Sequence, residues 1–208
     1  MLVRLAKDLN VPNLIVGDEI RKLKSQNTNP VYQPLFDNMQ KGALLNDGIV
    51  WAILTKKIRE TDMNTGFILD GFPRTLDQAI IMELSGFQYD LIVNLKQHEV
   101  IIISKMLGRR ICTSCGANYN VADVNFGGYN LPSRKPKKEK TCDKCGGKLA
   151  KRKDDTKKTI KNRLDEYRQH TVPMEDYFAT TNKMIEFTPY AGVDDYPKLL
   201  DLIKQRLN

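Results

Sequence analysis

The chain alternates between two spacings of apolar residues. Apolar positions three or four residues apart predict amphipathic helices, and short apolar runs bounded by turn residues predict buried strands. The expected helices cover about residues 2–9, 17–25, 35–40, 47–58, 75–84, 100–107, 155–170 and 199–207, with a further helix starting at Pro173. The expected strands cover about 14–16, 67–69, 91–93 and 190–193. Because strands alternate with helices, the pattern predicts an α/β fold, a parallel sheet wrapped by helices.

The segment 109–152 interrupts this alternation. It contains Gly, Pro, Cys and Lys and has little apolar periodicity. We therefore expect three parts: a core over 1–108, an inserted subdomain over 109–152, and the rest of the core over 153–208. The first helix has no capping residue ahead of it, so the chain begins as if partway along a helix.

Length and composition limit the class of protein. The chain has 208 residues, of which 41% are hydrophobic and 28% charged. These values fit one globular domain, or one domain with a small insert, and exclude a disordered or collagenous chain. The longest apolar runs fall far short of the roughly 20 residues that span a bilayer. Charges occupy the N-terminal positions where a signal peptide needs its apolar core.

The net charge of +8 is concentrated in one region. Residues 131–163 contain 14 Lys or Arg and 4 Asp or Glu, a net charge of +10, so the remainder carries −2. A basic region of this size points to an anionic partner: a nucleotide, a nucleic acid or a membrane surface.

Four cysteines form two similar pairs inside the insert. Each pair is Cys-x-x-Cys followed by Gly: Cys112 with Cys115, and Cys142 with Cys145. Two such knuckles supply the four thiolates of a closed tetrahedral zinc site. Four protein ligands leave no open position for water, so we expect structural Zn²⁺. Without a secretion signal, a metal in a reducing compartment is favoured over disulfides; unrelated thiols or a redox pair are the alternatives.

The stretch from Gly66 to Thr75 reads Gly-Phe-Ile-Leu-Asp-Gly-Phe-Pro-Arg-Thr and is the most specific in the chain. A strand that ends in Asp70 and continues into a rigid turn places its side chains at the carboxyl edge of the sheet, where α/β sheets bind ligands. Gly71 lets a ligand approach the backbone, and Arg74 offers a planar fork for phosphate. Asp70 could hold a hydrated Mg²⁺. A tight turn with a surface arginine is the alternative interpretation.

With this turn, the chain resembles the adenylate kinase family. The matching motifs follow one another in the family's order: Gly17-Asp18-x-x-Arg21, Asp70-Gly-Phe-Pro-Arg74 through Gln78, Gly108-Arg109-Arg110, Arg152-x-Asp154-Asp155 and Arg163-Leu-x-x-Tyr167. The two knuckles match the zinc-bearing lid of the family's long forms. The resemblance implies a P-loop nucleoside monophosphate kinase fold with a small zinc-ribbon-like β lid. It also implies reversible transfer of a phosphoryl group from ATP to AMP, with Mg²⁺.

The resemblance assigns roles to particular residues. The AMP-binding residues would be Gly17, Arg21, Leu45, Gly71, Arg74, Gln78, Arg152 and Arg163, with the AMP-binding helices at about 17–46. The ATP-binding residues would be Arg109, Asn118 and Tyr119. The catalytic residues would be Asp70, Arg74, Arg109, Arg152 and Arg163, with Asp70 acting through Mg²⁺ and its waters. The expected partners are ATP and AMP, without nucleic acid or membrane, and we expect a cytoplasmic monomer, with the mitochondrion as the alternative location.

One part of the family pattern does not occur in this sequence. Adenylate kinases begin with a strand and a Gly-x-x-Gly-x-Gly-Lys loop that holds the ATP phosphates. We therefore expect an N-terminally truncated kinase with a gap in its sheet, which forms no ADP as it stands. The alternative is a P-loop-less, kinase-like protein that binds AMP without catalysis. Val16 replaces the Thr usual in the family, which leaves open the preference for AMP, and for ATP over GTP.

A nucleic-acid-binding zinc ribbon is a different explanation of the basic segment. It predicts affinity that falls steeply with salt, and aromatic side chains beside the basic ones for stacking on bases. The insert offers only Tyr119, Phe126 and Tyr129 for that purpose. The kinase interpretation is therefore favoured over it.

Overall fold

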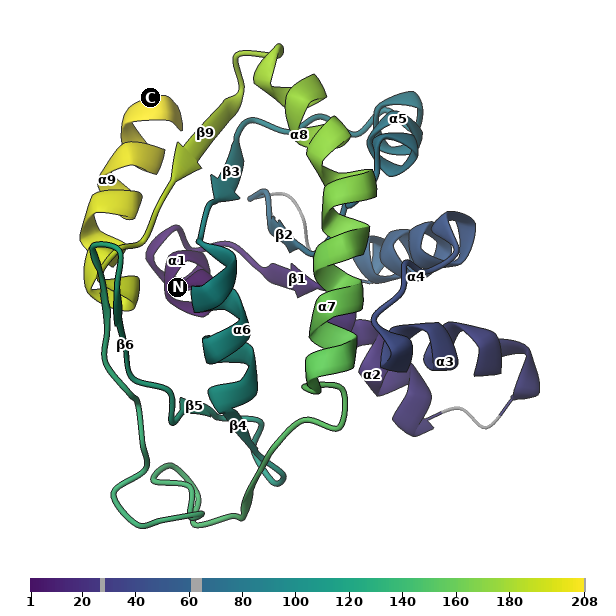
Figure 1. Cartoon of the computed structure of the whole chain (residues 1–208). Coiled ribbons are helices and arrows are strands. Elements are labelled where there is room, and N and C mark those ends of the chain that lie inside the picture. Colours follow the sequence, from purple (N-terminus) through teal and green to yellow (C-terminus); the bar gives the residue numbers. More distant parts are fainter. Residues whose placement is uncertain (27–28, 61–64, 208) are drawn as a thin grey trace.

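The computed structural model describes residues 1–26, 29–60 and 65–207. Within the described residues, α-helices flank short parallel strands, and a β-rich insert projects from one end (Figure 1). The α-helices are α1 (Leu2–Asp8), α2 (Val16–Gln26), α3 (Gln33–Lys41), α4 (Asp47–Arg59), α5 (Leu76–Leu84), α6 (Glu99–Gly108), α7 (Lys157–Glu166), α8 (Val172–Ala179) and α9 (Tyr196–Leu207). The strands are β1 (Asn13–Ile15), β2 (Ile68–Asp70), β3 (Ile92–Leu95), β4 (Arg109–Cys112), β5 (Asn118–Asn120), β6 (Val124–Phe126), β7 (Tyr129–Leu131), β8 (Leu149–Ala150) and β9 (Met184–Phe187).

The parallel sheet is divided into two halves, in keeping with the expected gap. Among the described residues, β1 pairs in parallel with β2, and β3 pairs in parallel with β9. A cavity of about 340 Å³ lies between the halves, lined by residues of β2 and β3 together with α5, α8 and β9. The helices that cover the strands therefore hold the two halves together.

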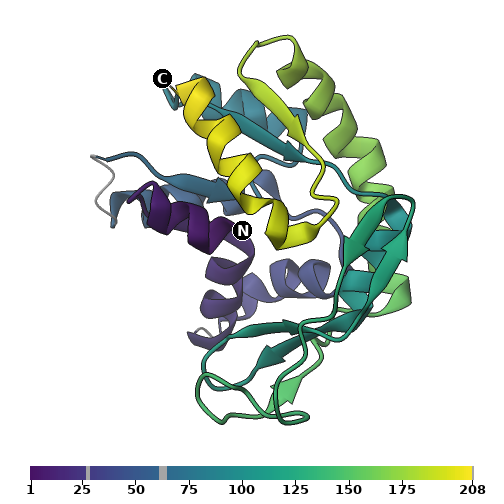
Figure 2. The same cartoon turned by 90° about the vertical axis from the view of Figure 1, so that its left-hand side faces the viewer.

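Two apolar clusters build the core around these halves. One cluster joins β1, α2, α3 and α4, and its buried residues include Ile20, Phe36 and Leu54. The other joins α1, β9 and α9 through Leu5, Ile185 and Tyr196, and the Tyr196 hydroxyl donates a hydrogen bond of 2.6 Å to Asp8. Figure 2 shows α1 and α9 side by side. The described helices and strands confirm the expected α/β class, with mixed helices and sheets.

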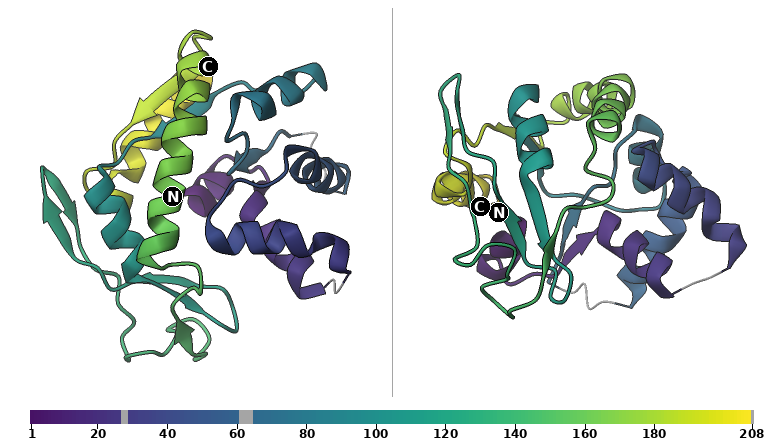
Figure 3. Two further views of the ribbon diagram at one scale, coloured as in Figure 1. Left: turned by 45° about the vertical axis from the view of Figure 1, so that its right-hand side comes forward. Right: turned by 60° about the horizontal axis from the view of Figure 1, so that its bottom comes forward.

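The insert forms a separate layer of antiparallel strands. Strand β4 lies between β5 and β8, and β6 pairs with β7 in a hairpin. The hairpin contacts the C-terminal part of the chain, because the Asn130 amide donates to the Tyr190 carbonyl at 2.9 Å and the rings of Tyr129 and Tyr190 lie 4.8 Å apart. In Figure 3 this insert and the α2–α4 region lie on opposite sides of α7.

The long helix differs from the sequence prediction at both its start and its middle. It begins at Lys157 rather than at the predicted residue 155, because the Thr156 hydroxyl caps it by accepting a hydrogen bond from the Thr159 amide. It does not end before Pro173. A π-helical turn, η2 (Tyr167–Thr171), joins α7 to α8, and the Val172 amide donates to the carbonyl five residues earlier. This wider turn accommodates the proline, which would otherwise clash with the preceding turn of a helix.

The prediction of a final strand at 190–193 is wrong. The strand is β9, at Met184–Phe187, and residues Gly192–Asp195 form a 3-10 helix. Gly192 has a positive φ of 65°, and the Asp195 carboxylate accepts a hydrogen bond from the Ala191 amide at 2.6 Å. These turn interactions exclude an extended backbone there.

Candidate functional site

The candidate site lies at the carboxyl ends of β2 and β3, where parallel α/β sheets bind ligands. Asp70 ends β2, and Gly71, Phe72 and Pro73 form the turn that follows. This turn lines the cavity between the two halves of the sheet. The long helix passes over the same cavity, because Tyr167 and Thr171 of η2 also line it.

The turn fixes Arg74 close to its own backbone. Gly71 has a φ of +83°, and a Cβ atom at Gly71 would lie 3.1 Å from the Arg74 guanidinium, so only glycine suits this position. The Arg74 Nε donates to the Gly71 carbonyl at 2.9 Å. Phe72 is buried, and its ring stacks on Trp51 of α4 at 5.8 Å, which anchors the turn to the core.

Gln78, in the helix that follows this turn, links the turn to α4. Gln78 lies in the first turn of α5, where its backbone N–H donates a hydrogen bond of 3.1 Å to the hydroxyl of the capping residue Thr75. Its side-chain Oε1 accepts from the Arg74 backbone amide at 2.7 Å, and its Nε2 donates to the Asp47 carboxylate at 2.6 Å. Asp47 begins α4, just beyond Leu45, which packs against the larger apolar cluster. The Gln78 side chain is therefore held in one orientation.

Five arginines from separate segments converge on this edge of the sheet. They are Arg21 of α2, Arg74, Arg109 of β4, Arg152 of the segment after β8, and Arg163 of α7. Loss of hydration lowers the pKa of Arg74, and the charges of Arg163 and Arg21 lower it further. Loss of hydration likewise lowers the pKa of Arg152, with the charges of Arg109 and Arg21 adding to it. An anion bound among these arginines would relieve their mutual repulsion.

Carboxylates hold three of these arginines in place. The fully buried Asp155 accepts two hydrogen bonds from Arg109, at 2.9 and 2.5 Å. Asp154 accepts from Arg163 at 2.5 Å, an interaction that outweighs the effect of burial and lowers the pKa of Asp154. Arg21 pairs with Asp18, one turn earlier on α2.

Asp70 stands beside these arginines in a different electrostatic state. Burial raises its pKa, the Arg74 charge opposes that rise, and the charge of Asp18 adds to it. The ionised carboxylate is thus incompletely compensated by the protein. A divalent cation carried in by a phosphate ligand would supply the missing positive charge.

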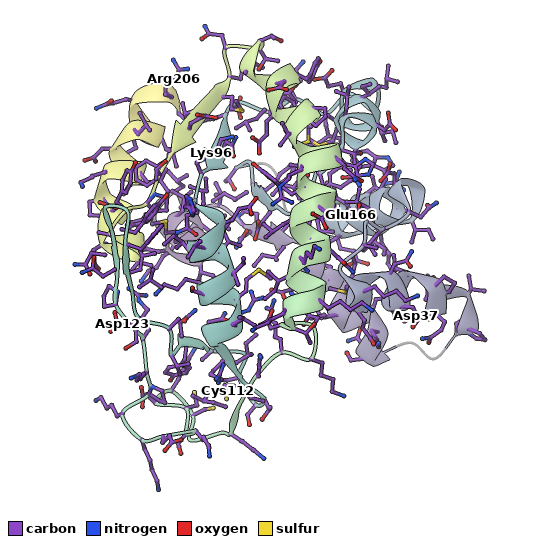
Figure 4. All side chains as sticks on the ribbon, in the orientation of Figure 1. Asp37, Lys96, Cys112, Asp123, Glu166 and Arg206 are labelled. Atoms are coloured by element: carbon purple, nitrogen blue, oxygen red, sulfur yellow. The ribbon has the colours of Figure 1, made fainter. Side chains whose placement is uncertain are left out.

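The four cysteine sulfurs in the insert lie within 4.8 Å of one another, a set that could hold one metal ion. The knuckle turns close through amide hydrogen bonds from Gly116 to the Cys112 carbonyl at 3.0 Å and from Gly146 to the Cys142 carbonyl at 2.8 Å. Both glycines have positive φ values, 72° and 71°. Figure 4 shows Cys112 in the insert, apart from the labelled Lys96 and Glu166 of the core. The cysteine cluster therefore supports the insert rather than the edge of the parallel sheet.

Two of the expected ATP-binding residues, Asn118 and Tyr119, lie on β5, next to this cluster. Asn118 is exposed. The Tyr119 hydroxyl lies 3.5 Å from the Cys142 sulfur and accepts a hydrogen bond from the Asp143 amide at 2.7 Å. The hydrogen bond from Tyr119, together with nearby backbone amides, lowers the pKa of Cys142 to about 6. In this arrangement the Tyr119 hydroxyl serves the cysteine cluster, and its contact with ATP stays a prediction.

The structure brings Gly17 into the same group, because a Cβ there would lie 3.4 Å from the Arg21 guanidinium. Sequence reasoning missed the supporting residues Asp18, Asp47 and Thr171. The Asp18 and Asp47 positions carried a signal, since each is an acidic residue in the first turn of a helix next to a predicted site. Thr171 carried none, because its contact depends on the π-helical turn.

Comparison with known proteins identifies similar chains. The family model for adenylate kinase matches residues 2–183. Adenylate kinase 1, chloroplastic, of Arabidopsis thaliana is 37% identical over 205 residues, which cover 97% of this chain and 72% of that protein. Adenylate kinase of Solanum tuberosum is 38% identical over 207 residues, covering 96% and 70%. Adenylate kinase of Carboxydothermus hydrogenoformans is 37% identical over 183 residues, covering 86% and 80%.

Helix length also bears on where such a chain can sit. Across the described part of the chain, every helix is too short or too polar to span a lipid bilayer.

We predict that Asp70→Asn raises the melting temperature of the ligand-free protein at pH 7. Because the folded state raises the pKa of Asp70, its ionised form opposes folding, and asparagine removes that charge. The gain should shrink as the pH falls through the raised pKa and vanish below the unfolded value of about 4. Calorimetry across pH 3–8 checks this, with the exposed Asp176→Asn as the control. A lower melting temperature for Asp70→Asn at pH 7 would contradict the conclusion that the ionised Asp70 carboxylate opposes folding.

Proposed function

The chain belongs to the adenylate kinase family, and from this premise we propose that its site is built for reversible phosphoryl transfer between ATP and AMP, giving two ADP. One observation carries the proposal: five arginines and Asp70 converge at the carboxyl edge of the sheet. Phosphoryl transfer requires little covalent chemistry from the protein. It needs the reactants in line and positive charge around the transferring oxygens, which is what this cluster offers.

We propose that AMP binds on the side of the cluster nearest α2 and β2. Arg21 and Arg74 would grip its phosphate as planar forks. Gly17 and Gly71 have no side chain between the backbone and the ligand, and Gln78 and the backbone near Leu45 would face the base. The fixed orientation of the Gln78 amide supports this role. Val16, which is buried at the start of α2, leaves the preferred base open.

The transferring phosphoryl group would lie among Arg109, Arg152 and Arg163. Their spread over three segments of the insert and the long helix supports this placement, because the charges can surround a group from different sides. Asp70 fits a hydrated Mg²⁺ that arrives with ATP, as adenylate kinases use it, and would orient that ion's waters. Asn118 and Tyr119 belong to the proposed ATP side, on the strand paired with the one that carries Arg109.

The insert is proposed as a lid, residues 109–152 between core segments 1–108 and 153–208. Its four clustered sulfurs fit structural Zn²⁺ held by Cys112, Cys115, Cys142 and Cys145. A closed four-thiolate set gives the small insert a cross-link in place of a large apolar core. We also propose a cytoplasmic monomer that binds neither nucleic acid nor membranes, although the Arabidopsis thaliana relative is named chloroplastic.

A second candidate function is AMP binding without transfer. It is favoured by the sequence itself, in which no Gly-x-x-Gly-x-Gly-Lys loop occurs among the 208 residues. Such a loop supplies the backbone amides and lysine that hold the donor phosphates. The AMP side and the donor side can therefore be tested separately.

We predict that Arg74→Ala weakens AMP binding at least about tenfold, because a charge-assisted contact to phosphate is lost. Its melting temperature should stay near that of the unmodified protein, since Arg74 lies among like charges. Isothermal titration with AMP measures the affinity, and Arg59→Ala, an exposed arginine at the far end of α4, is the control. Unchanged affinity in Arg74→Ala would refute the phosphate role.

We predict that the 208-residue chain binds AMP but forms no ADP from ATP and AMP with Mg²⁺, because it offers no Gly-rich loop to the donor phosphates. A coupled assay of ADP formation checks this beside the AMP titration. ADP formation above the rate of Arg74→Ala would show that the loop is dispensable. Failure to bind AMP at all would reject both candidate functions.

Removal of the metal should lower the melting temperature, because the insert loses its cross-link. Elemental analysis of the purified protein should give one zinc per chain, and the comparison is made before and after verified chelation. Cys142→Ser should reproduce the loss, whereas the exposed Lys144→Ala in the same knuckle should not. An identical melting curve after complete zinc removal would count against the structural site.

A further inference from the structure

We propose that Thr171 is a positioning residue for Arg74, acting through a hydrogen bond to the Arg74 backbone. The inference rests on the proposed AMP site and names the device that sets its central arginine. The Thr171 hydroxyl donates to the Arg74 carbonyl oxygen at 2.8 Å. The two residues are 97 positions apart in the chain, so this bond joins the long helix to the turn after β2.

The bond completes a three-point attachment of Arg74. The Arg74 backbone amide donates to the Gln78 side chain at 2.7 Å, and its Nε donates to the Gly71 carbonyl at 2.9 Å. Thr171 holds the remaining backbone polar group of the residue, the carbonyl. With amide and carbonyl both engaged, the Arg74 backbone has little freedom to rotate, and the direction of its side chain is set.

The π-helical turn is what brings Thr171 to this place. A π turn contains one more residue than an α-helical turn, so it changes which residues of the following helix face the site. Such turns are rare and recur at functional sites. Here the turn spans Tyr167–Thr171, and Thr171 is its last residue, over the same cavity that Gly71 lines.

Two other residues of the turn anchor it. The Tyr167 hydroxyl donates to the buried Glu175 at 2.5 Å, and Glu175 also pairs with Lys96 beyond β3 at 2.5 Å. Arg168 binds Glu99 at the start of α6, with its Nε 3.0 Å from the carboxylate. The backbone around Thr171 is therefore fixed by contacts of Tyr167 and Arg168 before it and of Glu175 after it.

Arg74 needs this attachment because two neighbouring arginines repel it. Arg163 and Arg21 place like charges beside its guanidinium in the absence of a ligand. A backbone free to rotate would let the side chain turn away from them. A fixed backbone keeps the guanidinium in the cluster before phosphate arrives, and preorganisation of this kind lowers the cost of binding.

The test replaces Thr171 with Val, which keeps a β-branched side chain and removes the hydroxyl. We expect Thr171→Val to bind AMP about three- to tenfold more weakly, the loss of one hydrogen bond, while adenosine, which has no phosphate, binds as to the unmodified protein. Thr171→Ser, which keeps the hydroxyl, should restore the AMP affinity. A purely structural role would weaken the binding of AMP and of adenosine alike.

A second readout does not depend on AMP. In the ligand-free protein, hydrogen exchange of the Arg74 Nε–H, followed by NMR, should speed up severalfold in Thr171→Val and return to normal in Thr171→Ser. Unchanged exchange in Thr171→Val would overturn the proposal whatever the AMP result. If the unmodified protein bound no AMP, the proposed function would fail, and the exchange data alone would decide whether Thr171 positions Arg74.

Discussion

The constraint on which the site depends is electrostatic repulsion among arginines gathered at one edge of the sheet. Like charges at close range disperse unless the protein holds them, and here carboxylates and backbone contacts do so. Asp155, fully buried, binds Arg109 through two hydrogen bonds, and Asp154 binds Arg163. Removing either partner of such a buried pair would leave an uncompensated charge, which is far more costly than the pair itself. These ion pairs therefore hold the arginines in place in the ligand-free protein.

The divided sheet determines where that cluster can form. Each parallel pair ends at the same edge, and the cavity of about 340 Å³ separates them. With no described strand pairing across the cavity, the helices carry the connection between the halves. The long helix contributes most directly, since its π-helical turn contacts the turn after β2 through Thr171 and the start of α6 through Arg168. The same helix carries Arg163. The helix that connects the two halves of the sheet therefore also positions an arginine of the site.

The sequence allowed prediction of the α/β class, the positions of most helices and the turn from Asp70 to Arg74, because these follow from local periodicity and from residues with restricted backbones. The two Cys-x-x-Cys knuckles were equally readable, and their sulfurs lie together. The strand Met184–Phe187 was missed because its four residues, Met-Ile-Glu-Phe, show no regular alternation, and the strand was instead predicted at 190–193. The uninterrupted helix through Pro173 could not be predicted, since it depends on a π turn fixed by contacts distant in sequence. The same long-range dependence hid Thr171.

We propose that the convergent arginines form a phosphate site. The most direct measurement is an NMR titration of the arginine Nε–H signals with AMP and, separately, with adenosine. We predict that AMP shifts the signals of Arg21 and Arg74 in a saturable manner, that adenosine leaves them in place, and that the signal of the distant Arg59 responds to neither. Equal shifts with AMP and adenosine, or no shift of Arg21 and Arg74 with AMP, would contradict it.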